Sequence, residues 1–279
     1  MANAMGQDPP EQGSIGQSSA GQGSAEETGP DKATADIGIV CVHAREIRPL
    51  LKRLDRVRRY TDRGCTFRGG FLNEVIRIAV VEAPRGFASQ RMAAEALVSE
   101  HRPEWIISTG FSSALSENVR AGDLSLATEI CDTHGNSIAV PCPIPGSRRV
   151  HSGRHVCADA HPLTAESKSR LRDSSGAIAV DTSSLAVAQV CQGAGIRFLS
   201  IRAIAVELAE DIPEAAAAMM FRPDSRALGS AFATVLRSLQ QMSEMNRWRM
   251  RSTEASDHLD RYLTGVILRL SEKLVRDRF

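Results

Sequence analysis

The chain has 279 residues, of which 42% are hydrophobic and 24% charged, and its formal net charge at pH 7 is +1. This composition is ordinary for a soluble globular protein, and the near-zero net charge gives no electrostatic case for binding nucleic acid or an anionic membrane. No apolar run approaches the roughly 18 residues that a membrane span requires, and the N-terminus lacks the basic start and apolar stretch of a signal peptide.

Residues 1 to about 35 are predicted to form a disordered tail, because they lack the residues that build a core. The segment is rich in Gly, Ser, Gln, Ala and Glu, and it contains no aromatic residue. Burial of so little apolar area cannot offset the entropy lost on ordering. We therefore expect the folded domain to span residues 36–279.

The folded domain is expected to begin with a buried strand over Ile37–Val42. Apolar residues from Ile47 to Leu54 follow at helical spacing, and Pro49 suits the first turn of a helix. The next predicted elements are strands near Val75–Val81, Trp105–Thr109 and Asp123–Ala127, and a helix over Phe87–His101. The segment Cys131–Asp173 contains several prolines and glycines, and we expect it to be irregular.

The C-terminal half continues the alternation of strands and helices. We predict a strand over Ala177–Asp181, a helix over Ser183–Gln192 that Gly193 and Gly195 end, and a long strand over Arg197–Val206. Apolar stripes over 228–239 and 259–270 predict two closing helices. This alternation favours an α/β sheet with helices on both faces.

Six cysteines are scattered along the chain, and none forms a C-x-x-C pair. In a chain this long, they indicate reduced thiols and a cytoplasmic protein rather than a disulfide framework. Four residues of metal-ligand type stand close together in the irregular segment: His151, His155, Cys157 and His161. Their spacing matches no recognisable metal site, so we expect no metal.

Several segments share a resemblance to one protein family. They are the opening Ile37-Gly38, the loop Ser108–Leu115 with Gly122-Asp123 after it, the segment Ala179–Cys191 and the strand end Arg202–Val206. In order and spacing, over about residues 37 to 220, they resemble the purine nucleoside phosphorylase and methylthioadenosine/S-adenosylhomocysteine nucleosidase family. The resemblance implies a three-layer α/β/α sandwich with a central mixed sheet and a homo-oligomer without a cofactor. The implied ligand is a purine nucleoside-like small molecule, with phosphate as an optional second one.

The resemblance aligns Glu46 with the carboxylate that holds the attacking water in the family's hydrolases. A carboxylate at this place can accept a proton from water or orient it. The residue alone has a simpler interpretation, a solvated side chain at a helix N-terminus that the helix dipole favours. Both interpretations stay open at this point.

Two further loops are candidates, because ligands of open α/β sheets bind beyond the carboxyl ends of strands. Gly86 precedes a predicted helix and is the one glycine that survives from a glycine-containing family loop. With Arg85 before it, it is a possible phosphate site; an ordinary surface turn is the alternative. Thr109 and Gly110 match a family loop that presents backbone N–H groups to a base or anion, but Phe111 replaces the family's Ser, and Ser113-Ala114 replace its two glycines, which narrows this option. Phe111 either stacks on the base or packs in the core.

The remaining candidates depart from the family's pattern. The family's ribose-binding Met-Glu is replaced by Thr182 and Ser183, whose hydroxyls carry no charge, so ribose binding should weaken. Asp181 aligns with a family Glu, and we favour the interpretation that it caps the following helix. Val206 occupies the position of the Asp that protonates the purine, and valine has no proton to give. Glu207 is adjacent, but one step along a strand reverses the face.

Two functions follow from these residues. The first is an enzyme that cleaves the N-glycosidic bond of a purine nucleoside-like metabolite, as hydrolase or phosphorylase, with Glu46 positioning the nucleophile. The second is a nucleoside-binding or scaffold protein whose active site has degenerated, which the changes at Ser183 and Val206 favour.

Overall fold

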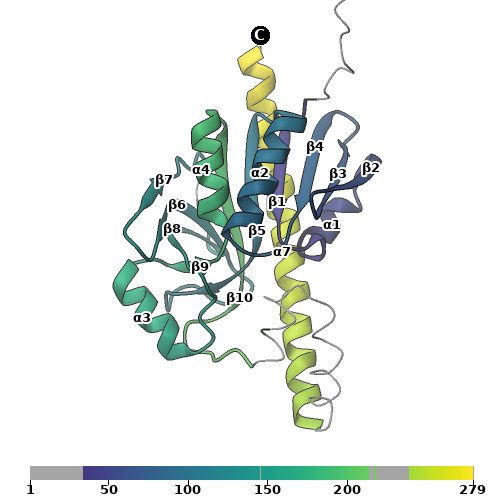
Figure 1. Ribbon diagram of the computed structural model, residues 1–279. Coiled ribbons are helices and arrows are strands. Elements are labelled where there is room, and N and C mark those ends of the chain that lie inside the picture. The colour runs from purple at the N-terminus through teal and green to yellow at the C-terminus, as the bar shows by residue number, and fades with distance from the viewer. Residues whose placement is uncertain (1–33, 145, 214–216, 218–238, 279) are drawn as a thin grey trace, which may run out of the picture. The chain divides into compact units, whose positions relative to one another are not determined.

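The computed structural model describes residues 34–144, 146–213, 217 and 239–278 (Figure 1). These residues all belong to one compact unit. The predicted N-terminal tail lies outside them except for Thr34 and Ala35, and so does the predicted helix over 228–239 except for Leu239. Both stay predictions.

A mixed β-sheet forms the centre of the described domain (Figure 1). Parallel pairing joins β1 (Ile37–Cys41) to β4 (Ile76–Glu82) on one side and to β5 (Trp105–Ala114) on the other. Two antiparallel strands, β2 (Leu54–Asp62) and β3 (Cys65–Leu72), extend the sheet beyond β4. The carboxyl ends of β1 and β5 therefore meet at one edge.

The other end of the sheet closes on itself. From β5 the pairing runs to β10 (Arg197–Val206), β6 (Leu124–Asp132), β8 (Val150–Cys157) and β9 (Ala179–Asp181), and then back to β5. The short β7 (Ser137–Ala139) pairs with β6 outside this ring. The predicted mixed α/β fold is confirmed, whereas the three-layer arrangement of helices stays a prediction.

The longer helices pack against this sheet. Two of them, α2 (Phe87–His101) and α4 (Ser184–Ala194), contact each other, and the C-terminal α7 (Leu239–Arg278) contacts β10 from another side (Figure 1). The remaining described helices are short: η1 (Ala44–Ile47), α1 (Arg48–Leu51) and α3 (Ala165–Ser175). No helix among the described residues has the length and the apolar run needed to cross a membrane.

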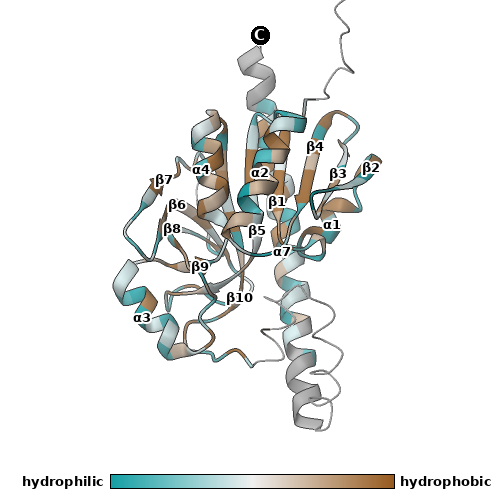
Figure 2. Ribbon diagram, viewed as in Figure 1, coloured by the Kyte–Doolittle hydropathy of each residue, from teal (hydrophilic) through white to brown (hydrophobic). Residues whose placement is uncertain are grey.

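Apolar residues form two main cores around the central strands, where Figure 2 shows hydrophobic residues concentrated. One core joins the sheet to α7 and includes Ile39, Ile107 and Leu263, all completely buried. The second joins the other side of the sheet to α2 and α4 and includes Leu97 and Val187. The predicted apolar stripe over 259–270 of α7 is therefore confirmed as core.

Two sequence predictions about local structure were wrong. The helical spacing from Ile47 yields only the four residues of α1, and Leu54 already begins β2. The segment Cys131–Asp173 is not irregular throughout, because it contains β7, β8 and most of α3. The prolines predicted an irregular segment, but Pro141, Pro143 and Pro162 stand between these elements and do not disrupt them.

Candidate active site

Glu46 is an acidic candidate close to where the carboxyl ends of β1 and β5 meet. It lies in η1, directly after β1, and only 1% of the residue is exposed. Its Oε2 accepts a hydrogen bond from the backbone N–H of His43 at 3.5 Å. Burial raises the pKa of this carboxyl to about 7, although the positive charges of Arg85 and Arg202 act in the opposite direction. The structure therefore differs from the solvated residue that the sequence alone favours.

Gly110 gives the carboxylate of Glu46 its space. This residue of β5 has a φ of +146°, and a Cβ at this position would stand 2.7 Å from Oε2 of Glu46 and 3.3 Å from Nη1 of Arg202. A side chain would thus meet both the carboxylate and the guanidinium in a backbone conformation that L residues rarely adopt. Because Gly110 has no side chain, the carboxylate of Glu46 can pack closely against β5.

Asp181 joins β9 to both α4 and β10. Its Oδ1 accepts hydrogen bonds from the backbone N–H groups of Ser183, the N-cap residue of α4, and of Ser184, at 2.7 and 2.8 Å, so Asp181 bonds the start of this helix from two residues before its N-cap. Its Oδ2 accepts from Nε of Arg202 at 3.1 Å, and both residues are buried. Burial would raise the pKa of Asp181, but Arg202 and the two backbone N–H groups outweigh it and hold the pKa low. Arg202 also donates to Oγ of Ser108 at 2.7 Å.

Arg85 connects the loop before α2 to the loop before α4. Its Nη1 donates to Oγ1 of Thr182 at 3.0 Å, and the charges of Glu46 and Asp181 act on its guanidinium. Gly86 is the residue before α2 and has a φ of +113°. The structure thus brings Glu46, Arg85, Thr182 and Asp181 to the same edge of the sheet. A phosphate site at Arg85 and Gly86 stays a prediction.

The other predicted residues are buried in the protein interior. Phe111 and Val206 belong to the core that faces α7, with 7% and no exposure. The core alternative for Phe111 therefore describes this structure. Ser183 is 3% exposed, and Thr109 is 1% exposed with no hydrogen-bond partner for its hydroxyl among the described residues.

The carboxylates that follow Val206 already have partners. Glu207 accepts from Arg120 at 3.1 Å, and Glu210 accepts from Arg251 at 2.6 Å. Asp211 accepts from the backbone N–H of Ala165 at the start of α3, at 2.7 Å. Because these contacts engage all three carboxylates, none of them replaces the proton donor that is missing at Val206.

Sequence reasoning missed the contribution of α7 to the position of Glu46. Ser256 of α7 donates from Oγ to the backbone carbonyl of Glu46 at 2.9 Å, and it is 7% exposed. His258 of the same helix contacts the carbonyl of Gly122 through Nδ1 at 2.7 Å. No local signal in the sequence connects η1 with residues about 210 positions later, so only the fold reveals these contacts.

His151 and His155, from the segment that was predicted to be irregular, contact separate partners. His151 contacts Asp123 at 3.0 Å, and His155 contacts Ser125 at 2.6 Å. Within the described part of the chain, no group of three or more His, Cys, Asp or Glu residues has a metal-binding arrangement.

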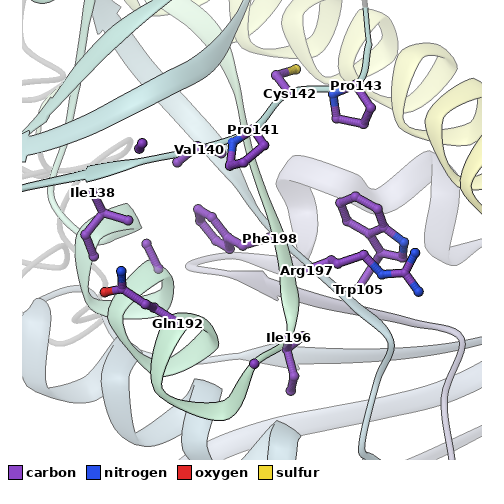
Figure 3. Close-up of a pocket in the computed structure, with 13 residues that line it drawn as sticks. Trp105, Ile138, Val140, Pro141, Cys142, Pro143, Gln192, Ile196, Arg197 and Phe198 are labelled. Atoms are coloured by element: carbon purple, nitrogen blue, oxygen red, sulfur yellow. The ribbon is translucent and has the colours of Figure 1, made fainter.

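An apolar cavity of about 550 Å³ lies elsewhere, at the amino ends of β5 and β10 (Figure 3). Trp105 and Arg197 are the first residues of these strands, and Pro141 and Phe198 also line the cavity. Glu46 packs against Gly110, five residues further along β5. The cavity is therefore separate from the candidate active site.

Comparisons with known proteins agree with this geometry. The sequence matches the Phosphorylase superfamily over residues 36–147 and 144–241. Over 94 residues it is 30% identical to 5′-methylthioadenosine/S-adenosylhomocysteine nucleosidase of Haemophilus ducreyi, a match that covers 34% of this chain and 40% of that relative. The match thus spans less than half of the relative's length.

Solved structures with the same fold include two enzymes at low sequence identity. The 5′-methylthioadenosine/S-adenosylhomocysteine nucleosidase of Campylobacter jejuni aligns with a TM-score of 0.62 at 15% identity, over 86% of this chain and 99% of that one. Futalosine hydrolase of Helicobacter pylori aligns with a TM-score of 0.54 at 19% identity, over 63% of this chain and 87% of that one. At these identities the likeness shows the fold alone.

Proposed function

We propose that this chain, which belongs to the phosphorylase superfamily, hydrolyses the N-glycosidic bond of a purine nucleoside-like metabolite. The observation that carries the proposal is the buried carboxyl of Glu46 at the carboxyl ends of β1 and β5, with a pKa raised to about 7. A base whose pKa lies near the working pH is best suited to take a proton from water. Such a carboxyl is costly to bury, which favours a functional role over a solvated surface residue.

The proposed reaction is a displacement at the anomeric carbon. The oxygen of a water molecule forms a bond to this carbon while Glu46 accepts the proton that the water loses. The bond between carbon and the base nitrogen breaks, and its electron pair leaves with the base. The base anion then takes one proton from water, and Glu46 releases its proton to solvent, so that the products are a free sugar and a neutral purine.

Charge favours water over phosphate as the nucleophile. The carboxylate of Glu46 would repel a phosphate dianion placed beside it, and Arg202 is already neutralised by Asp181 at 3.1 Å. The guanidinium of Arg85 lies between the same two acids, because the charges of both Glu46 and Asp181 act on it. The sequence similarity to a nucleosidase supports the same choice.

The loop after β9 is the proposed contact for the sugar. Thr182 and Ser183 offer hydroxyl groups, which can bond a sugar hydroxyl without the strength of a charged acceptor. Thr182 already accepts a hydrogen bond from Arg85, so its own hydroxyl hydrogen is the one that can donate to a ligand. We therefore propose a substrate whose sugar portion differs from an unmodified ribose.

A second candidate is a protein that binds the nucleoside without cleaving it. The observation in its favour is Val206, which is completely buried and offers no proton to the leaving base. Loss of acid assistance typically costs 10²–10⁴-fold in rate, so the two candidates differ in turnover rather than in ligand.

The test is a release assay with a panel of purine nucleosides, with and without phosphate. The account expects free base and free sugar in phosphate-free buffer, and a rate about 10²-fold lower in Glu46→Gln. Glu95→Gln is the matched control, because Glu95 lies in α2 on the surface with Arg91 as its partner. Binding of a nucleoside without base release would favour the second candidate, and release that requires phosphate would reject hydrolysis.

A further inference from the structure

The leaving base needs a hydrogen-bond donor, because it departs with the electron pair of the broken bond. We propose that Ser113 and His161 act together as this donor, an inference that rests on the proposed hydrolysis. Ser113 lies near the carboxyl end of β5, and His161 lies in the segment between β8 and α3. Their side chains meet at 2.7 Å between Oγ and Nε2.

The position of this pair in the sheet supports the assignment. In the parallel pairing of β5 with β10, Ser113 stands opposite Val206, directly after an irregularity in the register. The pair thus occupies the strand end where Val206 supplies only an apolar side chain. Ser113 is three residues beyond Gly110, against which the Glu46 carboxylate packs. The proposed base and the proposed donor therefore flank one edge of the sheet.

The electrostatic surroundings keep the imidazole neutral. Burial lowers the pKa of His161 to about 3, the positive charge of Arg85 adds to this effect, and Asp181 opposes it. Arg85 is also among the charges that act on Glu46, which ties His161 to the same group of residues. At neutral pH the pair then holds one hydroxyl hydrogen and one ring hydrogen.

Two such hydrogens suffice for a donor. In the tautomer with its ring hydrogen on Nε2, His161 donates to Oγ of Ser113, and the hydroxyl hydrogen of Ser113 is the one that can point toward a ligand. A neutral donor stabilises the charge that develops on the base through a hydrogen bond, and water supplies the final proton after the base has left. No full proton transfer from the imidazole is required.

Two strong donors among the described residues near this edge, Arg202 and Lys168, are engaged within the protein. Arg202 donates to Asp181 and Ser108, and the ammonium of Lys168 donates to the backbone carbonyls of Glu207 and Glu210. Removal of one well-placed donor to a developing charge typically costs 10²–10³-fold in turnover. The pair should contribute an effect of this size.

The test compares two leaving groups in His161→Phe and Ser113→Ala. One substrate is the purine nucleoside that the parent chain cleaves fastest, and the other is the 4-nitrophenyl glycoside of the same sugar, whose nitrophenolate departs without help from a donor. We expect each variant to lose about 10²-fold in kcat on the nucleoside and to change little on the nitrophenyl glycoside. His151→Phe is the matched control, because His151 contacts Asp123 instead. Val206→Asp added to His161→Phe should restore cleavage of the nucleoside.

The outcomes separate the two proposals. Equal losses on both substrates would mean that the pair only supports the structure, and this inference would be overturned while the hydrolysis stands. Full activity of both variants on the nucleoside would overturn it as well. A parent chain that releases no base from any nucleoside would instead remove the proposed function, and this inference with it.

Discussion

Glu46→Gln should stabilise the folded protein at alkaline pH, because the structure holds a carboxyl where its charged form is disfavoured. The ordinary pKa is 4.5, and burial raises it to about 7 in the folded state. Between these values the folded state binds more protons than the unfolded state, so the free energy of unfolding falls as pH rises through this window. A shift of about 2.5 units at 1.36 kcal/mol per unit corresponds to about 3 kcal/mol.

Urea unfolding of the parent and of Glu46→Gln at pH 4 and pH 8 measures this effect. Glutamine resembles the protonated acid in shape and lacks the charge, so its advantage should be about 3 kcal/mol at pH 8 and should shrink toward zero at pH 4. Glu95→Gln on the exposed face of α2 should show no such dependence. Equal stability of the parent and Glu46→Gln at pH 8 would refute the claim that the carboxylate is held out of water.

Three further substitutions test the geometry around Glu46. Gly110→Ala should stop base release, because its Cβ would stand 2.7 Å from the carboxylate, whereas Gly135→Ala, also at positive φ but with open space around it, should leave base release unchanged. Asp181→Asn should cost about 3–5 kcal/mol in urea unfolding, because it leaves Arg202 buried without its counter-charge, and a cost below about 1 kcal/mol would contradict the buried pair. Lys168→Met should speed hydrogen exchange in residues 207–210, because the ammonium bonds two carbonyls of that segment; unchanged exchange would argue against this role.

The sequence predicted the elements whose signal is local. The helix Phe87–His101 and the strand Arg197–Val206 have the predicted bounds, since a glycine precedes the helix and Gly195 separates α4 from the strand. The strands β2 and β3 were missed. Residues 55–62 of β2 are all exposed, and their sequence shows no alternation of apolar and polar residues. In β3, Gly69 and Gly70 interrupt the sequence pattern that is typical of a strand.

The site was less predictable, because its properties depend on distant parts of the chain. The position of Glu46 followed from the resemblance, but its burial depends on α7 and on the space beside Gly110. The contact of Asp181 with the start of α4 was predicted, whereas its ion pair with Arg202 requires the closed ring, in which β9 and β10 both pair with β5. Side chains from separate elements meet only in the folded chain, and the spacing of residues along the sequence does not show which of them will be in contact.

The pH dependence of kcat/KM for base release tests most directly whether Glu46 is the base. This quantity reports the ionisation of the free enzyme, so the account predicts a rate that rises about tenfold per pH unit below pH 7 and levels off above it. In Glu46→Gln the residual rate should lose this rise. A parent profile without a rise near pH 7, or the same rise in Glu46→Gln, would contradict the assignment of Glu46 as the group that activates water.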